Sequence, residues 1–304
     1  MTDGPMIFDR KARYLASADA LLTHLDGLLC ADDGYPDPPS WGYAFTYLAA
    51  LASGSDQHLD LAKKAVRHLA RQNEKNRDFA WEFVVYALQQ TKRLNADAEI
   101  PFDGYRSKGT RMFNWYLLRI QNKSLCDCLS FIDLFTFRSL LKIYQTGTGL
   151  VLDEFKTRSL QYHAFSLFVM CNIFEQMPEQ TWLKEHIVRG VRCSLDHILS
   201  DGTALFLGRG QEQIFGYGAL LYVLDYCHTT IGQIDETAID LVARKLLSFQ
   251  RHDGSYPLVL RQREPELEMI SFAGDTPAGW YGYNTLYDYQ PFLAYCLLKT
   301  GQMP

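Results

Sequence analysis

A loop-and-helix unit recurs along this chain and constrains its fold more than any other feature. In each copy an Asp-Gly pair follows a helix-like run, and a short loop then leads into an apolar run rich in aromatic residues. The Asp-Gly pairs begin at Asp33, Asp103, Asp201 and Asp253. Repetition over a few tens of residues indicates that one supersecondary unit is used several times to build a common core.

Two kinds of helix are expected within these units. Segments 15–29, 183–198 and 239–249 carry apolar residues at spacings of three and four with charged residues between them. That pattern is typical of a helix on the outside of a layer. Segments that are apolar nearly all round are typical of buried helices, and they lie at 43–52, 79–88, 165–174, 214–227 and 286–298.

Pairing an outer helix with an inner one predicts an all-α fold. We expect an (α/α) toroid of five to six helical hairpins with little or no β structure. No Pro- or Ser-rich linker divides the 304 residues, so we expect a single toroid domain over residues 1–304.

Charge and composition exclude several classes of function. The formal net charge is −5, without a basic block, which argues against nucleic acid as a partner. No apolar run is long enough to predict a membrane span. The seven cysteines lack zinc-site spacing, and no Asp-rich run of the terpene cyclase kind is present, so we expect no metal or cofactor. Free thiols and the absence of a visible signal peptide predict a cytoplasmic location.

The starts of the inner helices are the expected ligand site. In a closed ring these starts meet at one mouth, whatever their separation in the sequence. Aromatic side chains with a few convergent polar groups are the usual form of a ligand pocket. We expect substrate contacts from Trp41, Glu82, Gln211, Tyr217, Trp280, Tyr281, Tyr283, Asn284 and Asp288.

Catalytic candidates lie at the same positions. A helix-start preference for acidic residues explains Glu212 but not the neighbouring Arg209. Tyr162 and His163 open another apolar helix, where a histidine is more often a core residue than a catalyst. Tyr or His could abstract the proton beside a uronate carboxylate, and Arg209, Asn114 or Gln211 could stabilise the developing charge. The catalytic candidates are therefore His163, Tyr162, Asn114, Arg209 and Glu212.

The carboxylates support a competing interpretation. Hydrolysis of a glycosidic bond usually uses two acids about 5–10 Å apart, and Glu82, Glu212 and Asp288 could supply them. Glu82 lies within an apolar run, where a carboxylate needs either a partner or a function. A third hypothesis is a glycan-binding protein without catalysis, for example in polysaccharide biosynthesis.

The pattern resembles the helical toroids of carbohydrate-active enzymes, above all heparinase II/III-type and alginate-lyase-type polysaccharide lyases. Unsaturated glucuronyl hydrolases are a related toroid class. The residues that carry the likeness are the loops at 33–36 and 253–257, Asn114-Trp115, Tyr162-His163 and the segment 280–284. The resemblance implies a cleft for an acidic glycan, such as a bacterial surface polysaccharide. It also implies β-elimination by Asn114, His163, Tyr162 and Arg209.

Overall fold

The computed structural model describes residues 9–72, 80–102, 112–232, 234–260 and 286–304. The inner helices are α2 (Gly42–Ala52), α4 (Trp81–Leu94), α5 (Phe113–Leu125), α7 (Leu160–Gln176), α9 (Ile214–Tyr226) and α12 (Leu286–Gly301). The outer helices are α1 (Arg10–Leu28), α3 (Leu59–Arg71), α6 (Phe131–Tyr144), α8 (Thr181–Leu195) and α10 (Glu236–Ser248). Two short segments, η1 (Asp56–His58) and η3 (Cys227–Ile231), precede α3 and extend α9.

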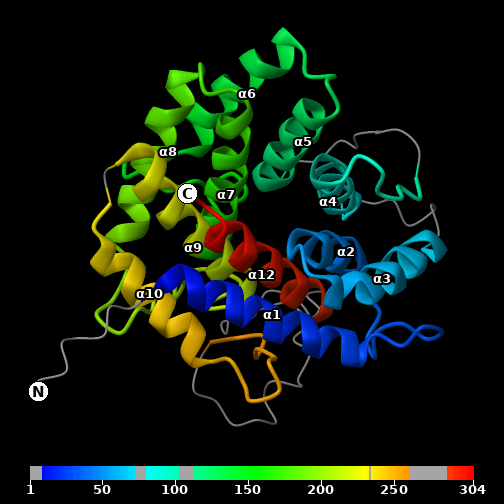
Figure 1. Ribbon diagram of the computed structural model, residues 1–304. Coiled ribbons are helices and arrows are strands. Elements are labelled where there is room, and N and C mark those ends of the chain that lie inside the picture. Colours follow the sequence, from blue (N-terminus) through cyan, green and yellow to red (C-terminus); the bar gives the residue numbers. More distant parts are fainter. Residues whose placement is uncertain (1–8, 73–79, 103–111, 233, 261–285) are drawn as a thin grey trace, which may run out of the picture.

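The inner helices form a closed ring. Each packs on the next in the order α2, α4, α5, α7, α9 and α12, and α12 packs back on α2 (Figure 1). The outer helices cover the ring: α1 lies on α12, α3 on α2, α6 on α5, α8 on α7 and α10 on α9. Within the described ranges the chain forms isolated β-bridges but no strand. This is an (α/α) toroid, and the fold class predicted from the sequence is confirmed.

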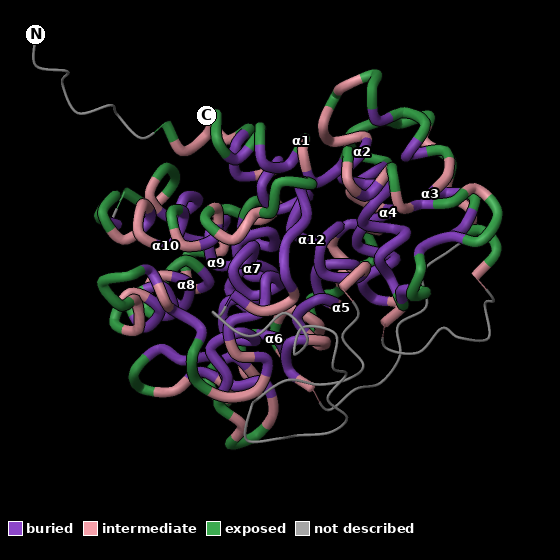
Figure 2. Tube along the Cα trace, turned by 90° about the horizontal axis from the view of Figure 1, so that it is seen from below, coloured by how far each residue is buried: buried purple, intermediate pink, exposed green. Residues whose placement is uncertain are grey.

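Burial separates the two kinds of helix as the sequence predicts. Every residue of α9 is buried, as expected for a helix with neighbours on all sides. In α10 the buried residues form one stripe, made by Ile239, Val242, Ala243 and Leu246. The tube in Figure 2 shows the same contrast, with buried residues in the inner helices and exposed residues on the outer layer. Amphipathic helices therefore enclose apolar ones.

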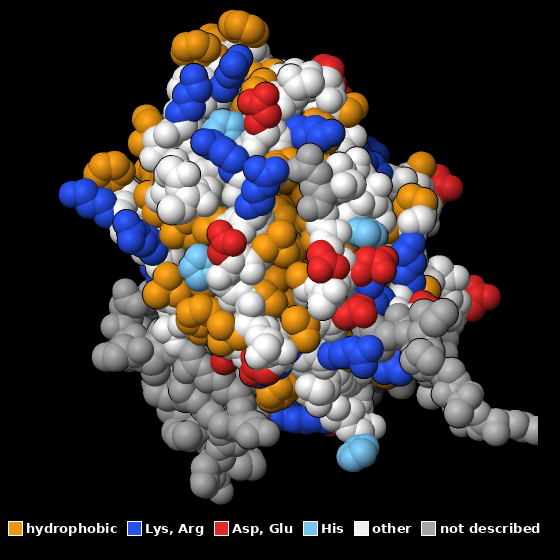
Figure 3. Space-filling view, turned by 90° about the vertical axis from the view of Figure 1, so that its left-hand side faces the viewer, with side chains coloured by type: hydrophobic (Ala, Val, Ile, Leu, Met, Phe, Trp, Pro, Cys, Tyr) orange, Lys and Arg blue, Asp and Glu red, His pale blue; other side chains and the backbone are white. Residues whose placement is uncertain are grey.

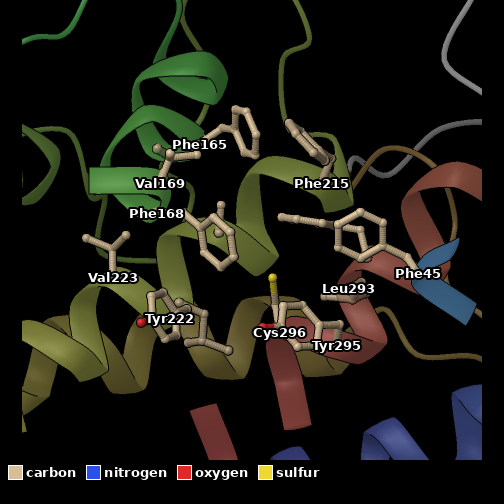
Figure 4. Close-up of a cluster of buried hydrophobic side chains, with 14 of the residues drawn as sticks. Phe45, Phe165, Phe168, Val169, Phe215, Tyr222, Val223, Leu293, Tyr295 and Cys296 are labelled. Carbon is tan, nitrogen blue, oxygen red and sulfur yellow. The ribbon is translucent and has the colours of Figure 1, made fainter. Parts of the chain in front are cut away.

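Aromatic side chains fill the centre of the ring. The Trp41 ring stacks on Phe83, with centroids 4.5 Å apart, and Phe215 lies 4.9 Å from Phe165 and 4.7 Å from Phe292. Figure 4 shows Phe45, Phe165 and Phe215 pointing toward one another from different inner helices. Because such rings bury large apolar areas, this aromatic plug joins helices that are distant in the sequence into one core.

A partly exposed polar network joins the inner helices away from the mouth end of the ring. Lys299 of α12 donates to Glu175 Oε2 and to Asn172 Oδ1 of α7, each at 2.9 Å. Tyr222 of α9 also donates to Glu175, and Tyr86 of α4 donates to Asn172 at 3.1 Å. The Glu175 carboxylate therefore pairs with a cation and a hydroxyl from two neighbouring inner helices.

None of the helices that the structure describes is long and apolar enough to cross a bilayer.

Candidate active site at the mouth of the ring

The leading ends of the inner helices lie at one end of the ring. Asp288, at the start of α12, accepts hydrogen bonds from the backbone N–H groups of Trp41 and Gly42 at the start of α2. Gln161 at the start of α7 donates to Gln213, which precedes α9, at 2.7 Å. Helices separated by many residues therefore present their first turns to a common region, here called the mouth.

Arg209 is the best-defined charged group at the mouth. Its guanidinium forms an ion pair with Asp153 and lies 5.1 Å from the centre of the Tyr162 ring. Its side chain is 13% exposed, whereas Asp153 is fully buried. The carboxylate and the ring hold the cation in one orientation from two sides, because guanidinium groups pair with carboxylates and stack on aromatic faces.

The loop before α9 fixes the position of Arg209. Gly208 and Gly210, on either side, both have positive φ. A Cβ at Gly208 would lie 2.2 Å from the carbonyl oxygen of Arg158, so only glycine fits this close approach. The Ser159 hydroxyl donates to the Arg209 carbonyl at 2.8 Å. The start of α7 and this loop are thus bonded together around the arginine.

Asp153 has an unusual environment for a carboxylate. Burial raises the pKa of Asp153 to about 6, and the nearby Arg209 charge acts in the opposite direction. Its Oδ1 has no hydrogen-bond partner among the described residues. Sequence reasoning missed this residue, although an acidic side chain directly after the apolar run Leu150–Leu152 is a signal that could have found it.

Glu212 and Tyr217 bond to each other beneath the loop. The Tyr217 hydroxyl donates to Glu212 Oε1 at 3.1 Å and accepts from the Ala204 N–H at 3.1 Å. Tyr217 is fully buried, whereas Glu212 is 5% exposed. Glu212 has φ +54°, a conformation that costs a non-glycine residue about 1–2 kcal/mol. Gln211, next to it, is half-buried.

Glu82 and Asp288 have structural partners. Glu82 accepts from Asn122 at 2.9 Å and pairs with Arg119 at 3.3 Å. Asp288 accepts three backbone N–H groups, those of Ser40, Trp41 and Gly42. Both carboxylates are almost fully buried. Trp41 itself belongs to the aromatic plug at the centre of the ring.

His163 lies in the wall of the ring and is 1% exposed. Its Nδ1 accepts from the Val151 N–H at 2.9 Å, so Nε2 carries the proton and donates to the Gly190 carbonyl at 3.1 Å. Burial lowers its pKa to about 4. This neutral imidazole, with both nitrogens bonded, has the bonding of a structural histidine.

Asn114 is buried at the start of α5, where its Oδ1 accepts from the N–H of Trp115 at 2.7 Å. The remaining predicted substrate contacts, Trp280, Tyr281, Tyr283 and Asn284, lie outside the described residues. Arg209 and Tyr162 are therefore brought into contact, and Glu212 lies on the same loop as Arg209.

An open groove of about 550 Å³ adjoins this cluster. It is lined by Met112, Phe113, Tyr116, Leu140, Tyr144, Glu154 and Phe155. Met112 connects the groove to the Arg209 cluster, since its sulfur lies 4.0 Å from Arg209 Nη2. The aromatic lining was not recognised in the sequence, because its residues come from the start of α5, the end of α6 and the loop after it. In the described part of the chain, no group of His, Cys, Asp or Glu side chains is placed to hold a metal ion.

Comparison with known proteins places this architecture in a recognised class. No family model matches the chain, and no curated protein matches it. Among solved structures, a possible member of glycoside hydrolase family 105 from Salmonella enterica is similar at a TM-score of 0.68 and 10% identity, over 99% of this chain and 96% of that one. A polysaccharide lyase is similar at 0.59 and 12% identity, over 94% and 97%.

A type II terpene cyclase from Scytonema is also similar, at a TM-score of 0.52 and 14% identity, over 97% of this chain and 99% of that one. These likenesses show the fold: the chain is a helical toroid of the kind found in carbohydrate-active enzymes, as the sequence resemblance implied. The fold also serves other chemistry, so the function must be argued from the mouth itself.

Proposed function

We propose that this chain is a carbohydrate-active enzyme that cleaves an acidic, uronate-containing glycan by β-elimination at the mouth of the ring. The observation that carries the proposal is the Arg209 cation, held against Tyr162 by the buried Asp153. A fixed guanidinium suits the carboxylate of a uronate, because it can donate two parallel hydrogen bonds to it. The toroid fold shared with a polysaccharide lyase supports the same class.

The proposed reaction uses Arg209 and Tyr162. Tyr162 is the base that removes the proton from the carbon beside the uronate carboxylate. The bond to the leaving glycosidic oxygen then breaks, and a carbon–carbon double bond forms. Arg209 stabilises the negative charge that develops on the carboxylate. Tyr162 transfers the proton from carbon to the leaving oxygen. Asn114 and His163 are proposed to position the starts of α5 and α7 rather than to touch the substrate.

The groove beside Arg209 is proposed to hold neighbouring sugar units. Phe113 and Tyr144 stack with their centroids 4.5 Å apart, and Phe155 is largely exposed. Aromatic faces of this kind can pack against the apolar faces of sugar rings.

The test is an assay with a panel of uronate glycans, in which absorbance of the unsaturated product is measured. We expect turnover by the natural chain and a loss of about a hundredfold or more in Tyr162→Phe and Arg209→Lys. Tyr226→Phe is the matched control, because Tyr226 lies at the far end of α9, and it should keep full activity. Equal activity in all three variants would remove the assignment.

Glycoside hydrolysis is the second candidate, and one observation favours it. Asp153 has a pKa of about 6, which suits a general acid near neutral pH, and Glu212 lies on the loop that carries its partner Arg209. New reducing ends without a double bond would support hydrolysis and reject elimination. Binding of a glycan without any turnover would instead support a non-catalytic glycan-binding protein.

A further inference from the structure

The outward face of α6 is apolar where a solvent-facing surface would be expected. Phe131 is 82% exposed, Ile132 74% and Phe135 65%, and all three lie in the first turns of the helix. Ile143, in the last turn, is 57% exposed. An outer helix of a globular protein normally presents polar side chains to water. Phe131, Ile132 and Phe135 are called the apolar tip below.

Cationic side chains continue the same face. Arg138 and Lys142 follow Phe131 and Phe135 at spacings of three and four, which places them on one line along the helix. An open groove of about 690 Å³ then lies between α6 and α8. Its charged lining consists of Lys142, Lys184, Arg189 and Arg192 with one acidic residue, Glu185.

These positive charges act together. Burial, with a further contribution from the charges of Arg189, Lys142 and Arg138, lowers the pKa of His186 to about 4. The chain as a whole has a net charge of −5, so this concentration of cations is local. Figure 3 shows hydrophobic side chains at the top of this side of the molecule and Lys and Arg side chains gathered below them.

We propose that the apolar tip and the α6–α8 basic groove dock the protein on the surface of an anionic lipid bilayer. The tip would enter the interface between headgroups and acyl chains, and the cations would contact lipid phosphates. An acidic glycan would match the cations but would leave the exposed phenylalanine and isoleucine side chains in water. A second copy using the same face would bring two cationic grooves together.

The position of the tip is compatible with catalysis at the mouth. Lys123, near the end of α5, bonds to Asp133 in the first turn of α6 at 2.6 Å. At the other end, the Phe113 ring at the start of α5 stacks on Tyr144 at the end of α6. The helices are therefore antiparallel, and the tip lies at the end of the ring opposite the mouth. The tip itself therefore does not cover the mouth.

The experiment measures flotation of the full chain with two kinds of vesicle. One is phosphatidylcholine alone, and the other is about three parts phosphatidylcholine to one part phosphatidylglycerol. We expect binding to the anionic vesicles that weakens with added salt, and little binding to the neutral ones. Phe131→Ser combined with Phe135→Ser, and separately Lys142→Gln combined with Lys184→Gln, should each lower the partition coefficient about tenfold or more.

Controls remove an exposed apolar or cationic residue elsewhere. Leu94→Ser, at the end of α4, and Lys63→Gln, on α3, change exposed residues and should bind as the natural chain does. Helical circular dichroism confirms folding of each variant. The proposal is overturned if no vesicle is bound at low salt, or if the tip variant and the Leu94→Ser control bind equally. It is also overturned if the tip variant abolishes self-association or capture of an acidic glycan while leaving vesicle binding unchanged.

Discussion

His163 and Asp153 are both buried near the mouth, yet burial changes their protonation in opposite senses. The histidine is neutral because burial lowers its pKa to about 4, and the carboxyl has a pKa raised to about 6. Both shifts follow from the same cause, which is the cost of a charge away from water. The His163 shift should make stability depend on pH, and the Asp153 shift should make both stability and activity depend on it.

His163 should make the fold sensitive to acid. A histidine in the unfolded chain has a pKa near 6.5, so the stability linked to this group is fully present above that pH and is lost as the pH falls toward 4. The loss should amount to roughly 3 kcal/mol. Urea unfolding of His163→Gln and the natural chain at several pH values measures it, since glutamine can keep one hydrogen bond but does not titrate.

Asp153 acts in the opposite direction, because a raised pKa adds stability as the pH falls through about 6. The natural chain therefore shows the sum of both effects, and the difference between the two proteins isolates the histidine. An unchanged slope between pH 7 and pH 4 in the variant would contradict the prediction.

Asp153 should also decide the pH dependence of activity. In the proposed elimination its ionised form holds Arg209, so activity should rise as the pH increases through about 6. A hydrolase that uses Asp153 as general acid would lose activity over the same range. The pH profile of kcat/KM shows whether activity rises or falls through pH 6. In Asp153→Asn this change in activity near pH 6 should disappear under either mechanism.

The sequence could locate some site residues but not their partners. Arg209 and Tyr162 stood out because polar groups at the starts of apolar helices are conspicuous. Their contact with Asp153 was not predictable, because that residue lies on a loop and the repeating unit gives it no special position. The bonding of His163 to Val151 and Gly190 likewise depends on loop and helix positions that the pattern leaves open.

The start of α2 is stabilised across the ring rather than by a cap of its own. The first N–H groups of α2 are satisfied by Asp288 of α12, because the residue before the helix, Trp41, makes no side-chain cap. A carboxylate also interacts favourably with the positive end of the helix dipole. The start of one element therefore depends on another that is far away in the sequence.

Asp288→Ala should lower the free energy of unfolding by about 2–3 kcal/mol, because it leaves buried N–H groups without a partner. Thermal melting measures the change. Asp235→Ala is the control, since Asp235 caps α10 at an exposed position and its loss should lower stability less. Equal losses in the two variants would show that the bond across the ring contributes nothing beyond an ordinary cap.

Whether a helix is inner or outer was predictable where its segment showed a clear pattern, either an apolar stripe or a continuous apolar run. The stripes of α1, α8 and α10 and the continuous apolar runs of α2, α7, α9 and α12 were recognised. The range of α6 was left unassigned, because Phe131, Ile132 and Phe135 lie on its exposed side. Hydrophobicity alone does not tell which face of such a helix meets the core.

The aromatic plug couples the whole ring. Phe215 contacts the ring of Trp41, just before α2, and rings from α4, α7 and α12. Phe215→Ala should lower the free energy of unfolding by about 3–5 kcal/mol, because it leaves a cavity at the centre. Urea unfolding measures the loss. Phe206→Ala, at a partly exposed position, should change stability by about 0.5 kcal/mol or less, and a similar loss in both variants would contradict a central role for the plug.

Closure of the ring was predictable from repetition, since hairpins with one apolar face each must find neighbours on both sides. The network of Lys299, Glu175 and Asn172 was not, because its members join positions far apart in the sequence. The residues at 280–284 stay a prediction.

The seam of the ring lies between α12 and α2, and Lys11 near the beginning of the chain bonds to the carbonyl oxygens of Met303 and Pro304 at its end. During synthesis on the ribosome, the early helices must therefore wait for the last one before the circle is complete. Until then their aromatic faces stay uncovered and open to aggregation. The nascent protein should depend on chaperones until α12 leaves the exit tunnel.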